Sequence, residues 1–575
     1  MKILGISSGH DAGAAIIEDN QVLAAINEER LNREKLYWGS PLLSISECLR
    51  IANLSLKDID EVVFANLTNG AGIQREFRSG RLTFKKRLFD ASSYTGLLDK
   101  KIIKKIYLFL LGGLRSERET FKLIRENGFN SSCRYLEHHL AHAASAYYTS
   151  PFNLDDKVLV VTTDGSGDGI GAAIFTINQN GFLKRRNETS FYHSPGAFYS
   201  NITYNLGFKP LNQESKITGL AAYGQPEKTL DIFRKYLKAD LKKLEYRSKL
   251  GCFGRPAAKK LHLLCQGQKR EDIAAGLQKR IEEVCAALIQ AALQKYQCNK
   301  VCLAGGLFAN VRLNQAILEL PNVEDIYIHP HMGDGGLAVG AALALWAETC
   351  QRKNQPVFPQ KLSHVYLGPS FTDEEIEIVL KNSAFDYHYS ENIELAIAEL
   401  LASGKVVARF NGKMEYGPRA LGNRSILYQA NDPTVNDWLN KRLRRSDFMP
   451  FAPIILFEEA ANYFENFDPA HSFASEFMTI TYRTTEKCQK QAPAVVHVDG
   501  TARPQAIKEE VNPSMYKIIK EYQKITGLPI MINTSFNIHE EPIVCTPKDA
   551  LRAFQIGHLD VLVIGDYFIR GRPSL

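Results

Sequence analysis

Two histidines and one later aspartate have the spacing expected of a metal site. His138 and His142 are four residues apart in the run EHHLAH, residues 137–142. On a helix this spacing brings both imidazoles to one face, about one turn apart, and His139 points elsewhere. Asp334 lies in a glycine-rich turn just before an alanine-rich stretch. Two imidazoles and a carboxylate favour iron(II) over zinc or manganese and leave positions for a substrate oxygen. An HxxxH pair alone, however, is more often ordinary helix surface or core.

A second turn rich in glycine and aspartate follows an apolar stretch that ends at Thr163. It reads TDGSGDG over residues 163–169. Glycines in such a turn let backbone amides approach phosphate oxygens closely. The turn lacks the oxygen ligands and terminal glutamate of a calcium loop, and it matches neither the P-loop nor the dinucleotide pattern. We therefore expect neither a calcium site nor a P-loop or dinucleotide-binding site at this turn.

Bulk composition describes an ordinary globular protein. The chain has 575 residues, 45% of them hydrophobic and 23% charged, which is enough for two or three domains. The sequence from Met1 runs directly into a strand-like segment without a secretory leader. Ten cysteines without paired CxxC spacing fit a reducing compartment. We expect a soluble, cytoplasmic protein.

The net charge of +7 is concentrated in one segment. Residues 75–105 contain ten basic and three acidic side chains, and an apolar run at 106–111 follows them. That run is far shorter than the ~20 residues needed to span a bilayer. We favour an insertion, about residues 70–130, whose basic face is solvated. The alternative is contact of residues 75–111 with an anionic or lipid-linked acceptor at a membrane surface.

The alternation of strand and helix patterns predicts an α/β protein of two domains. The strands expected in the first domain are residues 2–7, 13–17, 21–27, 62–65 (isolated), 158–163, 172–177 and 301–303. The last one leads through Gly305 and Gly306 towards Asn310, a strand-to-helix junction that can take a nucleotide. Two Asp/Gly hairpin turns plus this junction are typical of the duplicated actin-like ATPase and sugar-kinase fold.

A boundary is expected where prolines and polar residues interrupt the pattern, at residues 351–367. It divides the chain into domains 1–355 and 356–575. In the second domain we expect helices at 372–382 and 393–403 and a strand at 406–410. Dense polar sequence follows that strand, and the whole is a second α/β domain.

Several motifs together resemble one family from Lys2 to about Arg570. They are KMEYGPRALGNRSI at 413–426, NTSFN at 533–537, EPIV at 541–544, Asp560, ESKITGLAAYG at 214–224 and the N-terminal motifs. In order and separation they resemble the NodU/CmcH family of O-carbamoyltransferases. The resemblance implies an N-terminal domain similar to the transferase that adds threonylcarbamoyl to tRNA. It also implies a YrdC-like C-terminal domain.

The resemblance further implies a reaction in two steps. The C-terminal domain joins carbamoyl phosphate to ATP, supplied with Mg²⁺, and releases phosphate and pyrophosphate to give carbamoyl-adenylate. The N-terminal domain then transfers the carbamoyl group to an acceptor hydroxyl. Because a mixed anhydride is short-lived in water, an enclosed path would limit its hydrolysis.

The same resemblance assigns roles to individual residues. Fe(II) is expected at His138, His142 and Asp334, with Asp164 near the metal or orienting a ligand. His10 and Asp11 match a catalytic turn motif, and His10 is the first candidate for the base because imidazole titrates near neutral pH. A turn residue bonded to backbone is the alternative for His10. The residues expected to bind nucleotide or carbamoyl-adenylate are Gly305, Gly306, Asn310, Arg419, Arg424, Ser425, Arg503, Thr534, Ser535 and Asn537.

One departure from the family pattern affects the carbamoyl phosphate site. Leu443 and Met449 stand where many members carry Lys and Arg. The nearby cations that could compensate are Lys441, Arg442, Arg444 and Arg445. We prefer relocated cations as the explanation. A different acyl-phosphate donor or lost adenylation are the alternatives.

The leading hypothesis is therefore an ATP-dependent O-carbamoyltransferase acting on a hydroxyl of a sugar. The acceptor would belong to a polysaccharide, a glycolipid or a secondary metabolite, and a homodimer is compatible with this function. A tRNA-modifying transferase is a second hypothesis, kept by the basic segment, although nucleic acid is not the favoured partner. A nucleotide-binding protein without enzymatic activity is the third.

Overall fold

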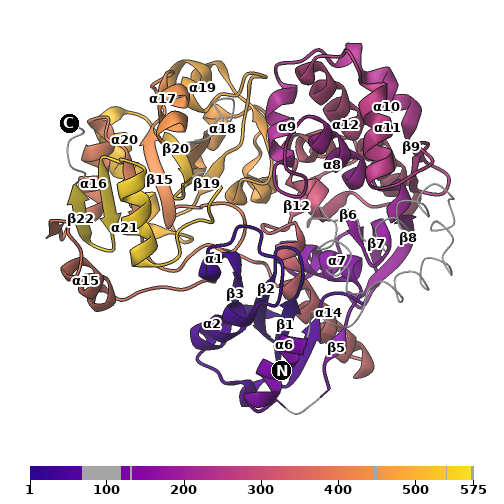
Figure 1. Ribbon diagram of the computed structural model, residues 1–575, viewed down its shortest axis with the longest axis horizontal. Helices are drawn as coiled ribbons and strands as arrows, with labels where there is room; N and C mark the ends of the chain where they lie inside the picture. Colours follow the sequence, from indigo (N-terminus) through magenta and orange to yellow (C-terminus); the bar gives the residue numbers. More distant parts are fainter. Residues whose placement is uncertain (68–117, 130–131, 444–450, 539, 571–575) are drawn as a thin grey trace. The chain divides into compact units, whose positions relative to one another are not determined.

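The computed structural model describes residues 1–67, 118–129, 132–443, 451–538 and 540–570 (Figure 1). The predicted basic segment 75–105 and the apolar run 106–111 lie outside these residues. The described chain forms two compact units. Unit 1 contains residues 1–28 and 36–362, and unit 2 contains residues 29–35 and 363–575. The division at 362/363 falls inside the segment where the sequence predicts a boundary.

The first sheet of unit 1 is built around a hairpin. Strands β1 (Lys2–Ser7) and β2 (Gly13–Glu18) pair antiparallel, and β3 (Gln21–Asn27) continues beside β2. On the other side of β1 lie β4 (Glu61–Phe64) and β5 (Arg134–Tyr135), both parallel to their neighbours. The sheet order is β3-β2-β1-β4-β5. The strand expected at 62–65 is therefore not isolated but pairs directly with β1.

The second sheet of unit 1 repeats this topology. Its hairpin is β6 (Val158–Gly167) with β7 (Ile170–Ile177), followed by β8 (Leu183–Ser190). Strands β11 (Lys300–Ala304) and β12 (Asp325–Ile328) lie parallel on the other side of β6. The order β12-β11-β6-β7-β8 is the order of the first sheet read from the other edge. The duplication expected from the two Asp/Gly hairpins is present.

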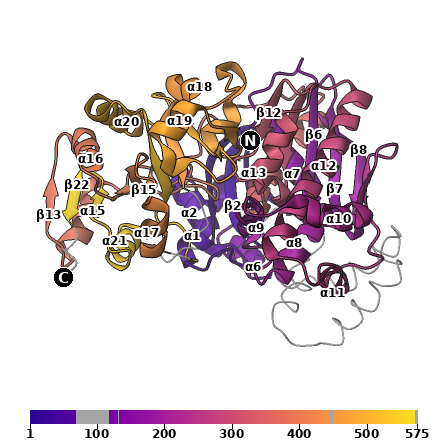
Figure 2. The same ribbon diagram turned by 90° about the horizontal axis from the view of Figure 1, so that it is seen from above.

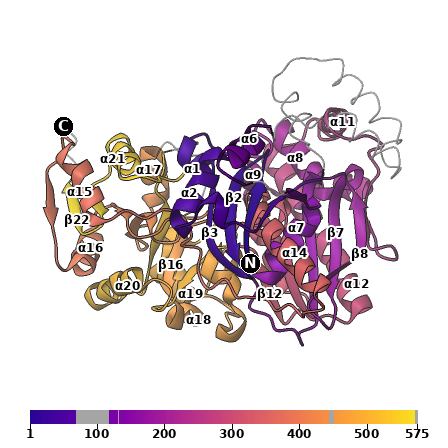
Figure 3. The same ribbon diagram turned by 90° about the horizontal axis from the view of Figure 1, so that it is seen from below.

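Two helices pack tightly together in unit 1 (Figures 1 and 3). Helix α7 (His138–Tyr148) lies on β6 and β11, and α14 (Leu337–Arg352) lies on β1 and β2. A Cβ atom added at Gly340 of α14 would lie 1.9 Å from the Ala141 carbonyl oxygen of α7. One added at Gly5 of β1 would lie 2.0 Å from the Ala338 oxygen. Only glycine fits at either position.

A helical region follows the hairpin of the second sheet, and in Figure 2 it gathers beside that sheet. Helix α8 (Pro195–Asn205) packs on β6, and the long α12 (Arg270–Tyr296) contacts α9 (Glu214–Ala221). The remaining elements of unit 1 are α2 (Leu42–Ala52), α6 (Arg118–Glu126), α10 (Leu230–Tyr236), β9 (Leu237–Asp240), β10 (Glu245–Ser248), α11 (Arg255–Leu264) and α13 (Val311–Leu318).

Unit 2 is a second α/β domain, as the sequence predicts. Besides a two-stranded sheet of β17 (Tyr482–Arg483) and β18 (Thr501–Ala502), it has a main sheet with the order β13-β22-β21-β14-β15-β20-β16-β19. The strands are β13 (Tyr387–Tyr389), β14 (Val407–Phe410), β15 (Arg424–Gln429), β16 (Ala452–Leu456), β19 (Gln505–Ile507), β20 (Ile530–Ser535), β21 (Val561–Ile564) and β22 (Tyr567–Arg570). A YrdC-like fold for this unit stays a prediction.

Helices α16 (Ile393–Ala402) and α20 (Pro513–Thr526) bury their apolar faces in the core of unit 2. The helix predicted at 393–403 and the one predicted at 372–382, α15 (Asp373–Lys381), are confirmed to within a residue at each end. The other helices here are α17 (Val435–Arg442), α18 (Ala460–Tyr463), α19 (Glu486–Gln491) and α21 (Pro547–Ile556).

The short segment 29–35, which includes α1 (Glu29–Asn32), belongs to unit 2. Arg30 donates through Nη2 to the Gly417 oxygen at 2.8 Å. Arg33 donates to the Ile543 oxygen at 2.7 Å and to the Pro542 oxygen at 2.8 Å. The sequence does not predict that residues 29–35 belong to unit 2.

No helix in the described ranges combines the length and apolar character required to cross a bilayer.

The close approach of α7 and α14 leads to a stability prediction. Gly340→Ala is expected to lower the free energy of unfolding by about 1–3 kcal/mol, because the new methyl group must displace the Ala141 carbonyl. Chemical denaturation of the purified protein measures this change. Gly333→Ala is the control, since Gly333 has φ −80° and a Cβ added there would meet no heavy atom within 4 Å. Equal stability of the Gly340 variant and wild type would contradict the helix contact.

Candidate active site

The first two turns of α7 present two imidazoles at one point of unit 1. The Glu137 carboxylate caps the helix by accepting hydrogen bonds from the His139 and Leu140 amides. Because the helix starts there, His138 and His142 lie one turn apart on the same face. Their ring centroids are 4.6 Å apart. The spacing predicted from the sequence therefore holds in the fold.

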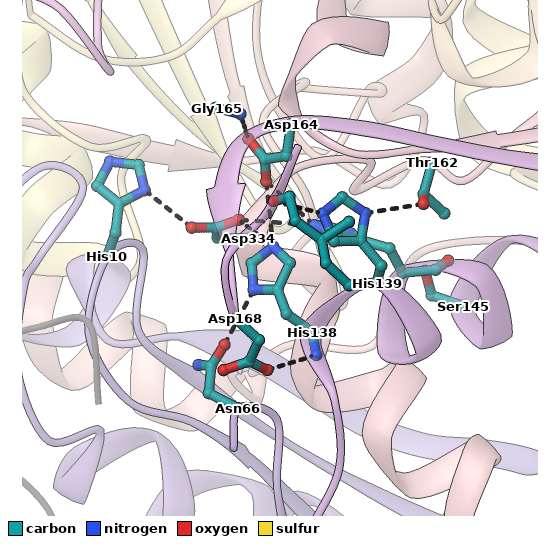
Figure 4. Close-up of polar contacts among 12 residues, drawn as sticks. His10, Asn66, His138, His139, Ser145, Thr162, Asp164, Gly165, Asp168 and Asp334 are labelled. Atoms are coloured by element: carbon teal, nitrogen blue, oxygen red, sulfur yellow. Dashed lines mark hydrogen bonds and ion pairs between the residues drawn. The ribbon is translucent and has the colours of Figure 1, made fainter. Parts of the chain in front are cut away.

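Two aspartates complete a cluster around these rings (Figure 4). The Asp164 Oδ2 atom, in β6, lies 3.2 Å from the Nε2 atom of His138 and 3.2 Å from that of His142. The Asp334 Oδ1 atom, just before α14, lies 3.6 Å from each of the same nitrogens. One ligand atom from each of the four side chains lies within 4.8 Å of all the others.

This arrangement fits a divalent metal ion. Ligand atoms that are each about 2.0–2.2 Å from one ion lie about 3.0–3.6 Å from one another. Asp334 Oδ1 is enclosed and makes no hydrogen bond among the described residues, as expected of an oxygen directed at an ion. The histidines are 4% and 0% exposed, whereas Asp164 is 17% and Asp334 is 23% exposed. Access is therefore from the carboxylate side.

The cluster has a strongly negative local field. Burial alone would lower the pKa of His138, but the hydrogen bond to Asp164 and the nearby carboxylates raise it to about 9. Burial would raise the pKa of Asp164, yet the two histidines hold it well below its usual range. Both aspartates are thus charged, and the field that raises the pKa of His138 would also attract a cation.

His139 does not join the cluster, as its place in the sequence predicts. Its Nδ1 atom lies 2.8 Å from the Thr162 hydroxyl and its Nε2 atom 3.0 Å from the Ile170 oxygen. Burial and the neighbouring histidines lower its pKa well below the usual value, so the ring is neutral. His139 holds the helix against the second sheet.

Two further polar residues contact His138, and sequence reasoning gave neither a role. The His138 Nδ1 atom lies 2.9 Å from the Asn66 Oδ1 atom, on the opposite side of the ring from Asp164 (Figure 4). Asp168 accepts hydrogen bonds from the His138 amide at 2.9 Å and the Leu67 amide at 3.0 Å. The sequence signal that could have identified Asn66 is its position: it is a polar residue just past the end of the parallel strand β4.

His10 and Asp11 lie in the turn between β1 and β2. His10 Nδ1 is 3.5 Å from Asp334 Oδ2, and the ring packs beside Trp38. Asp11 adopts φ +51°, and its backbone oxygen accepts from Asn27 Nδ2 at 3.0 Å. His10 is thus adjacent to the predicted metal ligands. Its role as base stays a prediction.

The Gly305–Gly306 turn lies directly against the cluster. Gly305 has φ +105°, and an added Cβ would lie 2.3 Å from the Thr163 oxygen. At Gly306 an added Cβ would lie 3.2 Å from Asp164 Oδ1. The backbone of Gly305 is therefore packed against β6, and the backbone of Gly306 lies directly beside the Asp164 carboxylate.

Asn310 occupies a different position from the two glycines. Its Oδ1 atom caps α13 by accepting from the Leu313 amide, and its side-chain amide exchanges two hydrogen bonds with Gln278. These bonds engage both ends of the side chain. The placement favours a structural role, and nucleotide binding by Asn310 stays a prediction.

In unit 2, Arg424 is committed to the protein backbone. The side chain is 0% exposed and its guanidinium stacks 3.6 Å from the Phe410 ring centroid. It donates to backbone oxygens of Asn411, Asn423, Pro369 and Gly412. Its placement favours support of the loop over direct contact with phosphate, and the nucleotide contact of Arg424 stays a prediction.

Arg419 and Arg503 differ from Arg424. Both are mostly enclosed and, within the described ranges, neither guanidinium makes a hydrogen bond or ion pair. Burial lowers the pKa of Arg419 to about 10. Burial and the charge of Arg419 lower the pKa of Arg503 well below its usual value. Two neighbouring cations without a carboxylate partner form a favourable site for an anion such as phosphate.

The remaining predicted residues of unit 2 lie on β15, β20 and the turn after β20. Ser425 and Ser535 are partners across these strands. The Ser425 hydroxyl accepts from the Gly422 amide at 3.0 Å, and the Ser535 hydroxyl donates to Asn537 Oδ1 at 2.8 Å. Thr534 pairs with Ile426 in the same ladder.

Glu415, which the sequence analysis gave no role, organises the GPRALGNRS loop. One of its carboxylate oxygens accepts hydrogen bonds from the amides of Leu421, Asn423 and Arg424, at 2.8, 2.8 and 3.1 Å. A carboxylate that accepts hydrogen bonds from several backbone amides fixes the conformation of the loop that contains Arg419.

The predicted carbamoyl phosphate residues are only partly described. Lys441 is exposed, and Arg442 forms an ion pair with Asp560 at 3.4 Å. Arg444, Arg445 and Met449 lie outside the described residues. Leu443 ends α17 and is 0% exposed, so it is a core residue in this chain. The leucine at position 443 is explained by the burial of its side chain in the protein interior.

Comparison with known proteins now identifies the class. Residues 2–343 match the family described as carbamoyltransferase N-terminus, and residues 398–571 match carbamoyltransferase C-terminus. Nodulation protein NolNO of Sinorhizobium fredii is 32% identical over 577 residues, 98% of this chain and 79% of that protein. An uncharacterized protein of Synechocystis is 33% identical over 618 residues, 99% and 96% of the two chains. Nodulation protein U of S. fredii is 27% identical over 575 residues, 94% of each.

These matches define a transferase built from two family domains. The chain belongs to the carbamoyltransferase family and is a carbamoyltransferase enzyme. The resemblance to the nodulation proteins drawn from the sequence motifs is confirmed, and the hypothesis of a protein without enzymatic activity is not retained.

The contrast between the arginines of unit 2 can be measured directly. Arg424→Met is expected to lower the free energy of unfolding by about 2–4 kcal/mol, because backbone oxygens lose their donors. Arg419→Met is expected to leave it unchanged or raise it, since a buried cation without a partner is removed. Denaturant titrations of both variants test this contrast. Equal destabilisation would refute the division of roles.

Proposed function

We propose that this enzyme is an ATP-dependent O-carbamoyltransferase that forms carbamoyl-adenylate in unit 2 and transfers its carbamoyl group in unit 1. The observation that carries the proposal is the cluster of His138, His142, Asp164 and Asp334 beside the Gly305–Gly306 turn. A metal-ligand set next to backbone that can accept a phosphate group suits a phosphate-bearing carbamoyl donor.

In the first step, water releases phosphate from carbamoyl phosphate, and an oxygen of the resulting carbamate bonds to the α-phosphorus of ATP as the bond to pyrophosphate breaks, which gives carbamoyl-adenylate. Arg419 and Arg503 are proposed to pair with phosphate oxygens, since neither guanidinium has a hydrogen-bond or ion-pair partner among the described residues. Glu415 and Arg424 hold the loop in shape through backbone hydrogen bonds. Lys441 and the cations beyond Leu443 are proposed to help hold carbamoyl phosphate.

In the second step, the acceptor oxygen bonds to the carbamoyl carbon and the bond from that carbon to the AMP oxygen breaks. His10 is proposed to take the acceptor's proton, because its imidazole lies at the edge of the cluster next to Asp334. Asp11 would help to orient the acceptor from the same turn. Bound Fe(II), the expected ion, would act as a Lewis acid on the phosphate side of the donor.

The acceptor is proposed to be a sugar hydroxyl of a polysaccharide, glycolipid or secondary metabolite. The presence of both carbamoyltransferase family domains in one chain supports this acceptor over tRNA. Reaction in the cytoplasm is the expected setting. Contact of residues 75–111 with a lipid-linked acceptor and a homodimeric state remain proposals of the same kind.

The first step can be followed without an acceptor. Wild-type protein incubated with ATP, Mg²⁺ and carbamoyl phosphate is expected to produce pyrophosphate and carbamoyl-adenylate, or AMP from its hydrolysis. Arg419→Ala and Arg503→Ala are expected to lower this turnover by about 100-fold or more, since each removes a preorganised donor. Mass spectrometry of the nucleotides under anaerobic conditions measures the products.

His138→Ala serves as the matched variant in unit 1. It should form carbamoyl-adenylate at the wild-type rate and, with an accepted hydroxyl compound, transfer no carbamoyl group. Omitting iron while keeping Mg²⁺ in excess should have the same effect as this substitution. If wild type binds ATP without turning it over, the two-step proposal is wrong.

A further inference from the structure

The two imidazoles of the cluster are held in different ways. The Nδ1 atom of His138 lies 2.9 Å from Asn66 Oδ1, whereas the Nδ1 atom of His142 is enclosed and has no hydrogen-bond partner in the described part of the chain. Both rings direct Nε2 at Asp164, at 3.2 Å. A difference between otherwise similar ligands indicates that one ring is positioned by a dedicated contact.

Asn66 Oδ1 is an acceptor only, so the contact keeps a proton on His138 Nδ1. A cation that displaces the other ring proton then meets the lone pair of Nε2, the atom that faces the two aspartates. A histidine that binds a metal through one nitrogen usually donates from the other to a carboxylate, carbonyl or water, which fixes its tautomer and orientation. Asn66 supplies this acceptor from the first sheet.

The backbone around this contact is also fixed. Asp168 accepts from the amide of His138 and from the amide of Leu67, the residue after Asn66. One carboxylate therefore ties the start of α7 to the end of β4. An added Cβ at Gly167 would overlap the His138 ring at 2.1 Å, so the ring cannot shift towards the hairpin turn. The position of Asn66 relative to the ring is thus held from both sides.

We propose that Asn66 is a positioning residue that orients His138 and fixes its Nε2 lone pair for a divalent metal ion. The inference rests on the proposed metal site and extends it to a residue outside the ligand set. Asn66 is not one of the four candidate ligands, and it acts through the His138 ring.

The test measures metal affinity with the full-length, metal-free protein. Co²⁺ is the probe, because its absorption spectrum reports the ligand geometry, and a competing chelator sets the free ion concentration. Asn66→Leu is expected to weaken Co²⁺ binding by about 10- to 100-fold and to alter the spectrum. Asn66→Asp, which keeps an acceptor oxygen in place, is expected to retain most of the affinity.

The matched control uses the neighbouring histidine of the same helix. Thr162→Val removes the hydroxyl that contacts His139 Nδ1, at 2.8 Å, and should leave Co²⁺ affinity at the wild-type value. Wild-type affinity in Asn66→Leu, or an equal loss in Thr162→Val, would overturn the inference. If Asn66→Leu does not fold, the smaller Asn66→Ser takes its place with the same expected loss.

His142→Ala separates this inference from the proposal beneath it. Binding that is lost in His142→Ala but kept in Asn66→Leu would reject the role of Asn66 alone. Failure of wild type to bind either Co²⁺ or Fe²⁺ would reject the metal site, and the role of Asn66 with it.

Discussion

The contact between α7 and α14 is the constraint on which the candidate site depends. Backbone meets backbone where Gly340 faces Ala141, and α14 approaches β1 equally closely where Ala338 faces Gly5. Helices pack this closely only where one of them lacks a side chain. Because α7 lies on the second sheet and α14 on the first, the contact joins the two halves of the duplicated fold. The same contact brings the histidines at the start of α7 to the aspartate just before α14.

Much of the candidate site could be predicted from the sequence, because the sequence patterns that indicate it are local. The pair His138 and His142 needs only helical spacing, and the strands around Asp164 and the Gly305 turn follow from apolar runs that end in glycine. Asn66 could not be found in this way, since 72 residues separate it from the ring it contacts. Its position depends on β4 pairing with β1, which no short-range pattern specifies. The assignment of residues 29–35 to unit 2 was not predicted from the sequence for the same reason.

The arginines of unit 2 show a second limit of sequence reasoning. A motif that contains several arginines indicates anion binding, yet it does not tell which side chain faces the ligand and which faces the backbone. Arg424 begins strand β15 and its guanidinium donates to backbone oxygens, whereas Arg419 lies near enough to Arg503 for its charge to lower the pKa of Arg503. Only the fold separates these roles. The carboxylate of Glu415, which lies close to Arg419 and Arg424 in sequence, completes the loop through backbone amides alone.

Because residues 29–35 belong to unit 2, no single cut in the chain separates the two units. Glu28, at the end of the first stretch of unit 1, accepts from the Ser44 amide at the start of α2. The next seven residues supply donors to carbonyl oxygens of Gly417, Pro542 and Ile543. During synthesis the ribosome therefore releases a part of unit 2 more than three hundred residues before the rest of it. A gene that began at Ser363 would encode a domain lacking its earliest-made piece, so the two units are inherited together.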